Sequence, residues 1–152
     1  MAKGEVKAEH VTKAVCDTFA EGEQKYGVKA RVILCCIIGM PPEIAEDVLK
    51  LAQQFQDNGV VGIDIAGDEA TIVGDMYNER EKKVFADAKA LGIHRTVHAG
   101  EDGPSEHVTS ALGKFFCKGA VFNIMSSFKE GEQTNNTTYL TYILHIYRYY
   151  GR

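Results

Sequence analysis

Three apolar segments rich in β-branched residues recur along the 152-residue chain, at 28–38, 60–69 and 93–101, with helical patterns between them. Continuous apolar runs of this length are typical of strands that are buried on both faces of a parallel sheet. Their starts lie roughly 32 residues apart, which is room enough for the helical crossover that parallel strands require. The pattern therefore predicts an α/β fold, and it leaves two architectures open: an open doubly wound sheet and a (β/α) barrel.

Amphipathic patterns predict the helices of this fold. Over residues 8–25, Val11, Val15 and Phe19 recur at helical spacing. A second helix is expected from Pro42 to a stop at Asn58-Gly59, because proline suits a first helical turn and glycine a helix end. A third helix is expected over 77–92. A fourth is expected over 105–119, with Ser105 as its N-cap.

The C-terminal segment has a different character. Residues 121–128 predict a short strand, and a polar loop follows. The aromatic run at 139–151 has no single apolar face, so helix, strand and irregular structure all stay open for it. We therefore expect a domain over residues 1–118 and a divergent, irregular tail over residues 119–152.

Composition excludes several classes of function. The net charge is −4 and no basic run occurs, which argues against a nucleic-acid-binding surface. The glycine motifs of dinucleotide-binding and P-loop proteins are absent. The first ten residues have no apolar core, so we expect no signal peptide, and no apolar run is long enough to predict a membrane span. Its four cysteines, at 16, 35, 36 and 117, form no C-x-x-C pair, so we expect free thiols and a cytoplasmic protein.

Functional groups of both candidate architectures lie where the strands end. The second strand ends in "AGDE" and the third in "HAGE", which places Gly67, His98 and Glu101 at these ends. Taken alone, His98 is either a metal ligand or a strand residue before a polar turn. Glu101 is either a general acid, if burial raises its pKa, or a solvated loop residue. Asp64 interrupts an apolar run, so it either has a partner inside the fold or ends the strand early.

Taken together and in order, "GVKARVILCC", "VVGIDIAGDE" and "GIHRTVHAGE" resemble the adenosine deaminase family of animals. The resemblance covers residues from about Gly27 to about Ser110, and it implies a zinc-containing (β/α) barrel with its site at the carboxyl ends of the strands. It implies that His98 is a zinc ligand and that Gly67 contacts the purine nucleoside through its backbone. It also implies that Glu101 protonates the purine ring while a zinc-activated water attacks C6.

The chain also departs from that family. Its histidines, at 10, 94, 98, 107 and 145, include no H-x-H pair, although the family takes two zinc ligands from such a pair. The resemblance stops near Leu112, and a barrel of this kind needs about 250 residues. We therefore expect a partial TIM (β/α) barrel with about three parallel βα units, unpaired sheet edges and an incomplete zinc site.

These observations lead to a main functional hypothesis and its alternatives. The main one is an adenosine deaminase that converts adenosine and 2'-deoxyadenosine to the inosines in purine salvage, with the isolated chain inactive. One alternative is a shortened, non-catalytic form that binds other proteins, and another is an independent small α/β domain. A third is a related deaminase that acts on N6-substituted purine nucleotides.

Overall fold

The computed structural model of the chain describes residues 6–72, 74–111, 121–122 and 139–145. Its elements, in chain order, are α1 (Ala8–Tyr26), β1 (Lys29–Ile37), α2 (Pro42–Gln54), η1 (Gln56–Asn58), β2 (Val60–Ala66), η2 (Glu69–Thr71), α3 (Glu79–Ala90), β3 (His94–Val97), α4 (Ser105–Ser110), β4 (Val121–Phe122) and β5 (Tyr139–His145). The three predicted strands and the helices between them are all present, which confirms an α/β fold.

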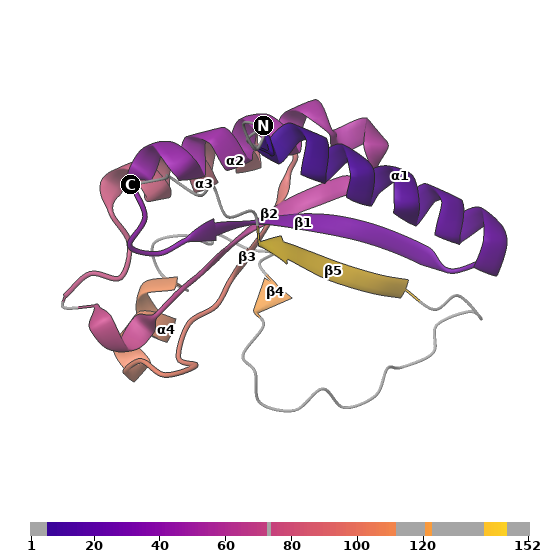
Figure 1. Cartoon of the computed structure of the whole chain (residues 1–152). Coiled ribbons are helices and arrows are strands. Elements are labelled where there is room, and N and C mark those ends of the chain that lie inside the picture. Colours follow the sequence, from indigo (N-terminus) through magenta and orange to yellow (C-terminus); the bar gives the residue numbers. More distant parts are fainter. Residues whose placement is uncertain (1–5, 73, 112–120, 123–138, 146–152) are drawn as a thin grey trace, which may run out of the picture.

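The strands form one sheet in the order β4-β3-β2-β1-β5, and every neighbouring pair is parallel. Helices α1, α2 and α3 lie together on one face of this sheet, whereas α4 lies near the carboxyl ends of the strands (Figure 1). Strands β1 and β2 pair with Cys35 opposite Asp64. The parallel βα units predicted from the sequence are therefore confirmed.

The C-terminal segment supplies β4 and β5, so it is not irregular throughout. Strand β4 lies within the short strand predicted over 121–128, and β5 is one of the alternatives left open for residues 139–151. Strand β5 pairs with β1 along seven residues, and β4 pairs with β3. The prediction that both edges of the three-strand unit lack partners is therefore wrong. Residues 139–145 are rich in aromatic and β-branched types, which favour strands, but their lack of alternation hid the strand from a periodicity analysis.

Several element ends also differ from prediction. Helix α2 ends at Gln54, and the chain then tightens into η1 before Gly59, whose φ of 105° only glycine adopts readily. Ser105 is the first residue of α4 and not its N-cap, because Pro104 precedes the helix and no side chain caps it. The described part of α4 ends at Ser110, and residues 112–119 of the predicted helix lie outside the described residues.

The core lies between the sheet and the three helices. Strand residues Leu34, Ile63 and Ile65 are fully buried there, and Val48 of α2 and Phe85 of α3 pack in the same cluster. Helix α3 begins with a capping box, in which the Asn78 side chain accepts the Glu81 N–H and the Glu81 carboxylate accepts the Asn78 N–H. This exchange explains how a glutamate is tolerated with only 4% of its surface exposed.

Three of the four cysteines fall within the described residues. Cys16, Cys35 and Cys36 are buried and free, as the sequence predicts, and Cys117 lies outside the described residues. Among the described helices, none combines the length and apolarity needed to cross a bilayer.

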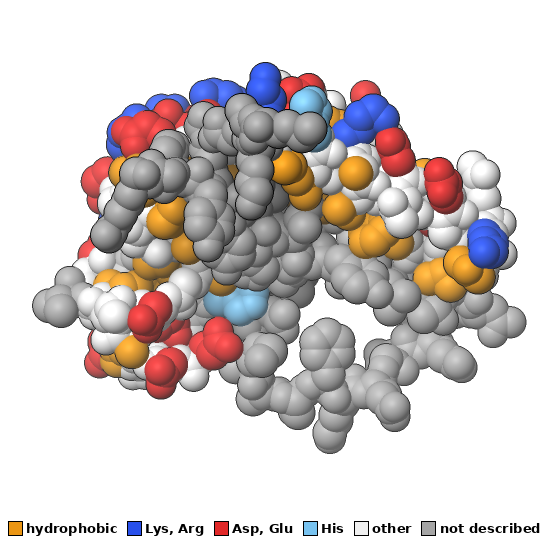
Figure 2. All heavy atoms as spheres, viewed as in Figure 1, with side chains coloured by type: hydrophobic (Ala, Val, Ile, Leu, Met, Phe, Trp, Pro, Cys, Tyr) orange, Lys and Arg blue, Asp and Glu red, His pale blue; other side chains and the backbone are white. Residues whose placement is uncertain are grey.

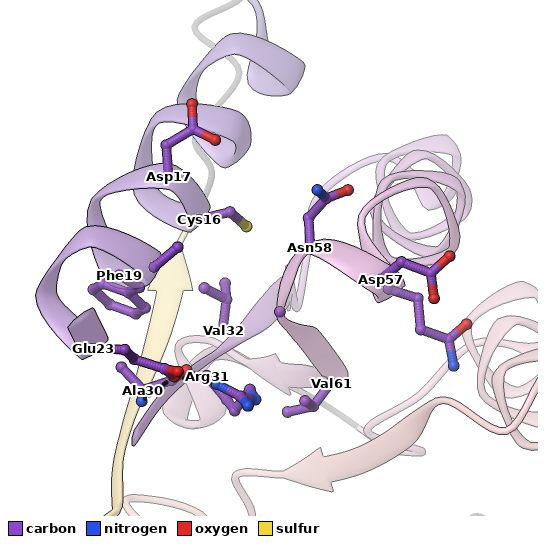
Figure 3. A pocket seen from close by; sticks show the side chains of 13 residues that line it. Cys16, Asp17, Phe19, Glu23, Ala30, Arg31, Val32, Asp57, Asn58 and Val61 are labelled. Atoms are coloured by element: carbon purple, nitrogen blue, oxygen red, sulfur yellow. Dashed lines mark hydrogen bonds and ion pairs between the residues drawn. The ribbon is translucent and has the colours of Figure 1, made fainter. Parts of the chain in front are cut away.

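A pocket of about 420 Å³ opens at the amino ends of β1 and β2, opposite the candidate site. Helix α1 lines one side of it and η1 the other, with the Arg31 and Glu23 side chains meeting at its lower edge (Figure 3). Glu23 accepts hydrogen bonds from the Ala30 N–H at 2.9 Å and from the Lys29 ammonium at 3.1 Å. This carboxylate therefore ties the C-terminal end of α1 to the start of β1.

We expect Glu23→Gln to reveal an acid-sensitive contribution to stability. The hydrogen bond from the Ala30 N–H, together with Lys29 and Arg31, lowers the pKa of Glu23 to about 2. A carboxyl group whose pKa is lower in the folded state stabilises the fold above its unfolded pKa, and that stabilisation is lost as the pH falls. Urea unfolding should therefore show a wild-type advantage over Glu23→Gln at neutral pH that shrinks between about pH 4.5 and pH 2.

Exposed Glu21, on the same helix, supplies the matched control as Glu21→Gln. If the wild type stays more stable than Glu23→Gln by the same amount down to pH 2, the lowered pKa of Glu23 in the folded state would be contradicted.

Candidate functional site

The carboxyl ends of the three central strands are held side by side by backbone hydrogen bonds. The Ile38 N–H donates to the Ala66 carbonyl at 2.9 Å, and the His98 N–H donates to the Ile65 carbonyl at 2.9 Å. These bonds continue the parallel pairing just past the ends of β1 and β3. Gly67 follows β2 and His98 follows β3. These bonds therefore bring the two predicted site residues together at the carboxyl ends of the strands.

Asp64 forms the centre of a polar cluster beneath this edge. Its side chain is fully buried on β2. One carboxylate oxygen, Oδ1, accepts a hydrogen bond from the Thr96 hydroxyl. The other, Oδ2, lies 2.8 Å from His98 Nδ1 and 3.5 Å from Cys35 Sγ. Of the two possibilities left open by the sequence, Asp64 therefore has partners inside the fold, and the strand continues past it to Ala66.

The charges of Asp64 and His98 stabilise one another. Burial alone would raise the pKa of Asp64, but its contacts with His98 and Thr96 outweigh burial and lower that pKa. The neighbouring Asp64 carboxylate raises the pKa of His98 against the opposing effect of burial. The His98 N–H is not aligned for a hydrogen bond, so the 2.8 Å contact is best described as an ion pair.

This pairing fixes which atom of His98 is available for a ligand. Nδ1 is buried against Asp64, which leaves Nε2 as the nitrogen for a metal ion or a substrate. Metal-binding histidines commonly have a carboxylate behind them in this arrangement, because it fixes the ring and raises its basicity. Within the described residues, however, no group of three histidine, cysteine or carboxylate side chains lies close enough to hold a metal ion. His98 fits a single ligand position, and the described residues do not complete the site.

The turn that follows β3 carries Glu101. Its backbone N–H donates to the Glu69 carboxylate at 2.7 Å, as do the N–H groups of Gly100 at 2.9 Å and Asp102 at 3.0 Å. The Glu101 side chain itself is exposed, so the burial that would favour a general acid is not present in the described structure. Its charge is near enough to contribute, after Asp64, to the raised pKa of His98. The two residues singled out in "HAGE" are thus electrostatic neighbours.

Gly67 is exposed at the end of β2 and packs closely against the residue after β1. A Cβ atom at this position would lie 2.8 Å from the Ile38 Cβ and within 3.2 Å of the Ile38 backbone. Gly67 thus combines an exposed backbone with a close approach to the segment that follows β1. Only glycine fits at this position without displacing the neighbouring strand.

We expect Gly67→Ala to destabilise the fold by about 1–3 kcal/mol, because an added methyl group would overlap Ile38 and push β1 and β2 apart. Gly22→Ala is the matched control. No atom lies within 4 Å of the Cβ it would add to α1, and alanine favours a helix over glycine by about 1 kcal/mol. Urea unfolding of both variants measures the difference, and equal stabilities for the two would contradict the close approach.

Two further residues of this region are buried, Glu69 and His107. From the sequence, Glu69 is either a group that supports the site from behind or a turn residue, and His107 carries no assigned role. His107 Nδ1 lies 3.6 Å from the Glu69 carboxylate. His94 is exposed at the start of β3, at the opposite end of the strand from His98. Acidic side chains gather on the surface around α4, with a histidine at the edge of the group (Figure 2).

The sequence profile of the adenosine deaminase family matches residues 1–118. The adenosine deaminase of Gallus gallus is 40% identical over 111 residues, which are 73% of this chain and 30% of that protein. The enzyme of Danio rerio is 41% identical over 109 residues, 72% of this chain and 30% of that protein. The chain thus spans about a third of the length of these relatives.

Solved structures show the same relationship. An adenine deaminase from Arthrobacter aurescens superposes with a TM-score of 0.60 at 25% identity, over 72% of this chain and 32% of that one. A zinc-bound amidohydrolase from Burkhoderia ambifaria superposes with a TM-score of 0.61 at 26% identity, over 71% and 29%. These relatives confirm the partial (β/α) barrel over the doubly wound alternative. The extent of the family match, together with the relatives' identity, shows that the chain belongs to the adenosine deaminase family.

Proposed function

We propose that this chain carries part of the active site of a zinc-dependent adenosine deaminase, which converts adenosine and 2'-deoxyadenosine to the inosines. His98 is the proposed zinc ligand, Glu101 the proposed proton donor to the purine ring, and Gly67 the proposed backbone contact to the nucleoside. The observation that supports this most strongly is the His98–Asp64 pair at 2.8 Å, next to the turn that carries Glu101. These groups share the edge of the sheet where barrel enzymes place their sites.

The surroundings of His98 suit its proposed role as a zinc ligand. Asp64 holds the His98 ring with Nε2 free, so this nitrogen is oriented toward a ligand without further ordering. Glu101 is exposed in the described structure, so its proposed role as proton donor to a ring nitrogen requires the bound purine or the rest of the barrel to cover its carboxyl group. A zinc ion, where its remaining ligands are supplied, would activate the attacking water.

The isolated 152-residue chain is proposed to be inactive and to bind no stoichiometric zinc. This follows from the single ligand that the described residues supply, compared with the three protein ligands of catalytic zinc sites. Robust deamination by the purified chain, with one zinc bound, would contradict it. The buried free cysteines support a reducing compartment such as the cytoplasm. We further propose that residues 1–118 form the family domain and residues 119–152 a divergent tail.

A chimeric enzyme tests the proposed chemistry. The matching segment of the Gallus gallus adenosine deaminase is replaced by the corresponding residues of this chain, so that the relative supplies the rest of the site. We expect the chimera to bind zinc and to release ammonia from adenosine, and to lose both properties with His98→Ala. A folded, zinc-bound chimera that leaves adenosine unchanged would overturn the proposal.

A further inference from the structure

Glu69 is a buried carboxylate that the proposed chemistry does not use. It is the first residue of η2, just beyond the end of β2, and only 3% of its surface is exposed. Its side chain reaches across to the turn after β3. There it accepts three consecutive backbone N–H groups, those of Gly100, Glu101 and Asp102, at 2.7–3.0 Å. One side chain thus accepts hydrogen bonds from three successive residues of the turn that contains Glu101.

The turn is shaped to close over this carboxylate. Gly100 has a φ of 76°, and a Cβ atom there would lie 2.6 Å from the Val108 side chain. A Cβ atom at Gly103 would collide with His107 Nδ1 and would lie 3.1 Å from the Glu69 Cβ. The two glycines therefore let the backbone pass close to Glu69 on one side and to α4 on the other. Consecutive N–H groups that converge in this way form an anion-binding nest.

The energetics favour a carboxylate in this nest over any neutral group. Burial alone would raise the pKa of Glu69, but the three N–H donors and the nearby His107 outweigh burial and lower that pKa. Hydrogen bonds to a charged acceptor are roughly twice as strong as those between neutral groups. Without the carboxylate, three backbone donors of the turn would lose their buried acceptor, so the turn would reorganise.

We propose that Glu69 is a positioning residue of this site: by accepting three successive N–H groups, it fixes the turn after β3 and hence the place of Glu101 beside His98. The inference rests on the proposed function, because it assigns Glu69 an effect on the proposed proton donor. All three hydrogen bonds from the turn to Glu69 come from backbone N–H groups. Glu69 links the segment after β2, which contains Gly67, to the turn after β3, which contains Glu101. The proposed nucleoside contact and the proposed proton donor are therefore held in place relative to one another.

Amide NMR and hydrogen exchange on the full chain test this inference. In the wild type we expect the amide protons of Gly100, Glu101 and Asp102 to be deshielded and protected, as carboxylate-bonded amides are. In Glu69→Gln, which replaces one acceptor oxygen by a donor, we expect the deshielding to disappear. We also expect exchange of these three amides to accelerate by about 10- to 100-fold. Amides of the β1–β2 pairing, such as that of Ile63, should keep their shifts.

Glu106→Gln is the matched control, since Glu106 is an exposed glutamate on neighbouring α4. It should leave the three turn amides unchanged. A structural role without positioning would accelerate exchange throughout the sheet and would not single out the turn. If Glu69→Gln fails to fold, the chemical shifts and exchange rates of the three turn amides in the wild type test the inference. Turn amides that exchange as fast as those of exposed loops would overturn the inference, as would unchanged shifts in Glu69→Gln.

The two proposals fail separately. A chimera that does not deaminate adenosine would overturn the proposed function, whatever the turn amides of this chain do. Unprotected turn amides would overturn the positioning role, even if the chimera is fully active.

Discussion

In the chimeric enzyme, Glu101→Gln is expected to lower kcat for adenosine by about a hundred- to ten-thousand-fold, the range typical of a lost general acid. Glutamine has nearly the same shape but no proton to donate at neutral pH. The Glu101 N–H still donates to Glu69 in this variant, because the substitution leaves the backbone intact. KM should therefore change much less than kcat, which steady-state kinetics of adenosine deamination will show.

Glu106→Gln is again the suitable control, because it makes the same chemical change a few residues further on, at an exposed position of α4. It should keep kcat within about twofold of the unsubstituted chimera, as surface substitutions usually have little effect. A Glu101→Gln chimera with undiminished kcat would remove Glu101 from the chemistry and leave it as a turn residue.

Asp64→Asn is expected to weaken zinc binding by the chimera by about 10- to 100-fold, the usual cost of losing a carboxylate behind a metal-binding histidine. Asparagine preserves the size of the side chain and an oxygen for the Thr96 hydroxyl, but it removes the charge that lies 2.8 Å from His98 Nδ1. The His98 ring then loses both its orientation and part of its basicity. Competition with a zinc-chelating dye will measure the affinity.

The matched control is Asp57→Asn, which changes an exposed aspartate in η1 at the opposite end of the strands. Its zinc affinity should equal that of the unsubstituted chimera. Equal affinities for the Asp64 and Asp57 variants would show that the carboxylate contributes nothing to metal binding, in spite of its contact with His98.

The sequence predicted those strands of the sheet whose own residues form a recognisable apolar pattern. The apolar runs around Leu34 and Ile63 specify buried parallel strands, because strands that are buried on both faces are made almost entirely of apolar residues, with Asp64 as the exception here. It failed where structure depends on distant partners. Strand β5 pairs with β1, and residues 139–145 show no alternation of apolar and polar residues that would predict this pairing. The ends of two helices differ from prediction for another reason, since the end of α2 before η1 and the start of α4 depend on local backbone geometry.

The candidate site was predictable in its composition and less so in its geometry. His98, Glu101 and Gly67 were identified through motifs at the ends of strands, and the structure places them at one edge of the sheet. The sequence leaves Glu69 open as a supporting group of the site or a turn residue. Its hydrogen bonds to the turn after β3 were not predictable, because nothing in the spacing of "AGDE" and "HAGE" shows that a side chain of one motif accepts backbone N–H groups of the other. Asp64 could be marked as unusual inside an apolar run, but not assigned to His98.

The pairing of β5 with β1 also has a consequence for biosynthesis. A ribosome makes β1 roughly a hundred residues before β5, and contacts between such distant segments form slowly because a long loop must close first. During that interval one edge of β1 offers its unpaired backbone groups to any other extended chain nearby. The yield of folded protein is therefore expected to depend on how quickly translation reaches the C-terminal strand, and on chaperones that shield the nascent sheet until it does.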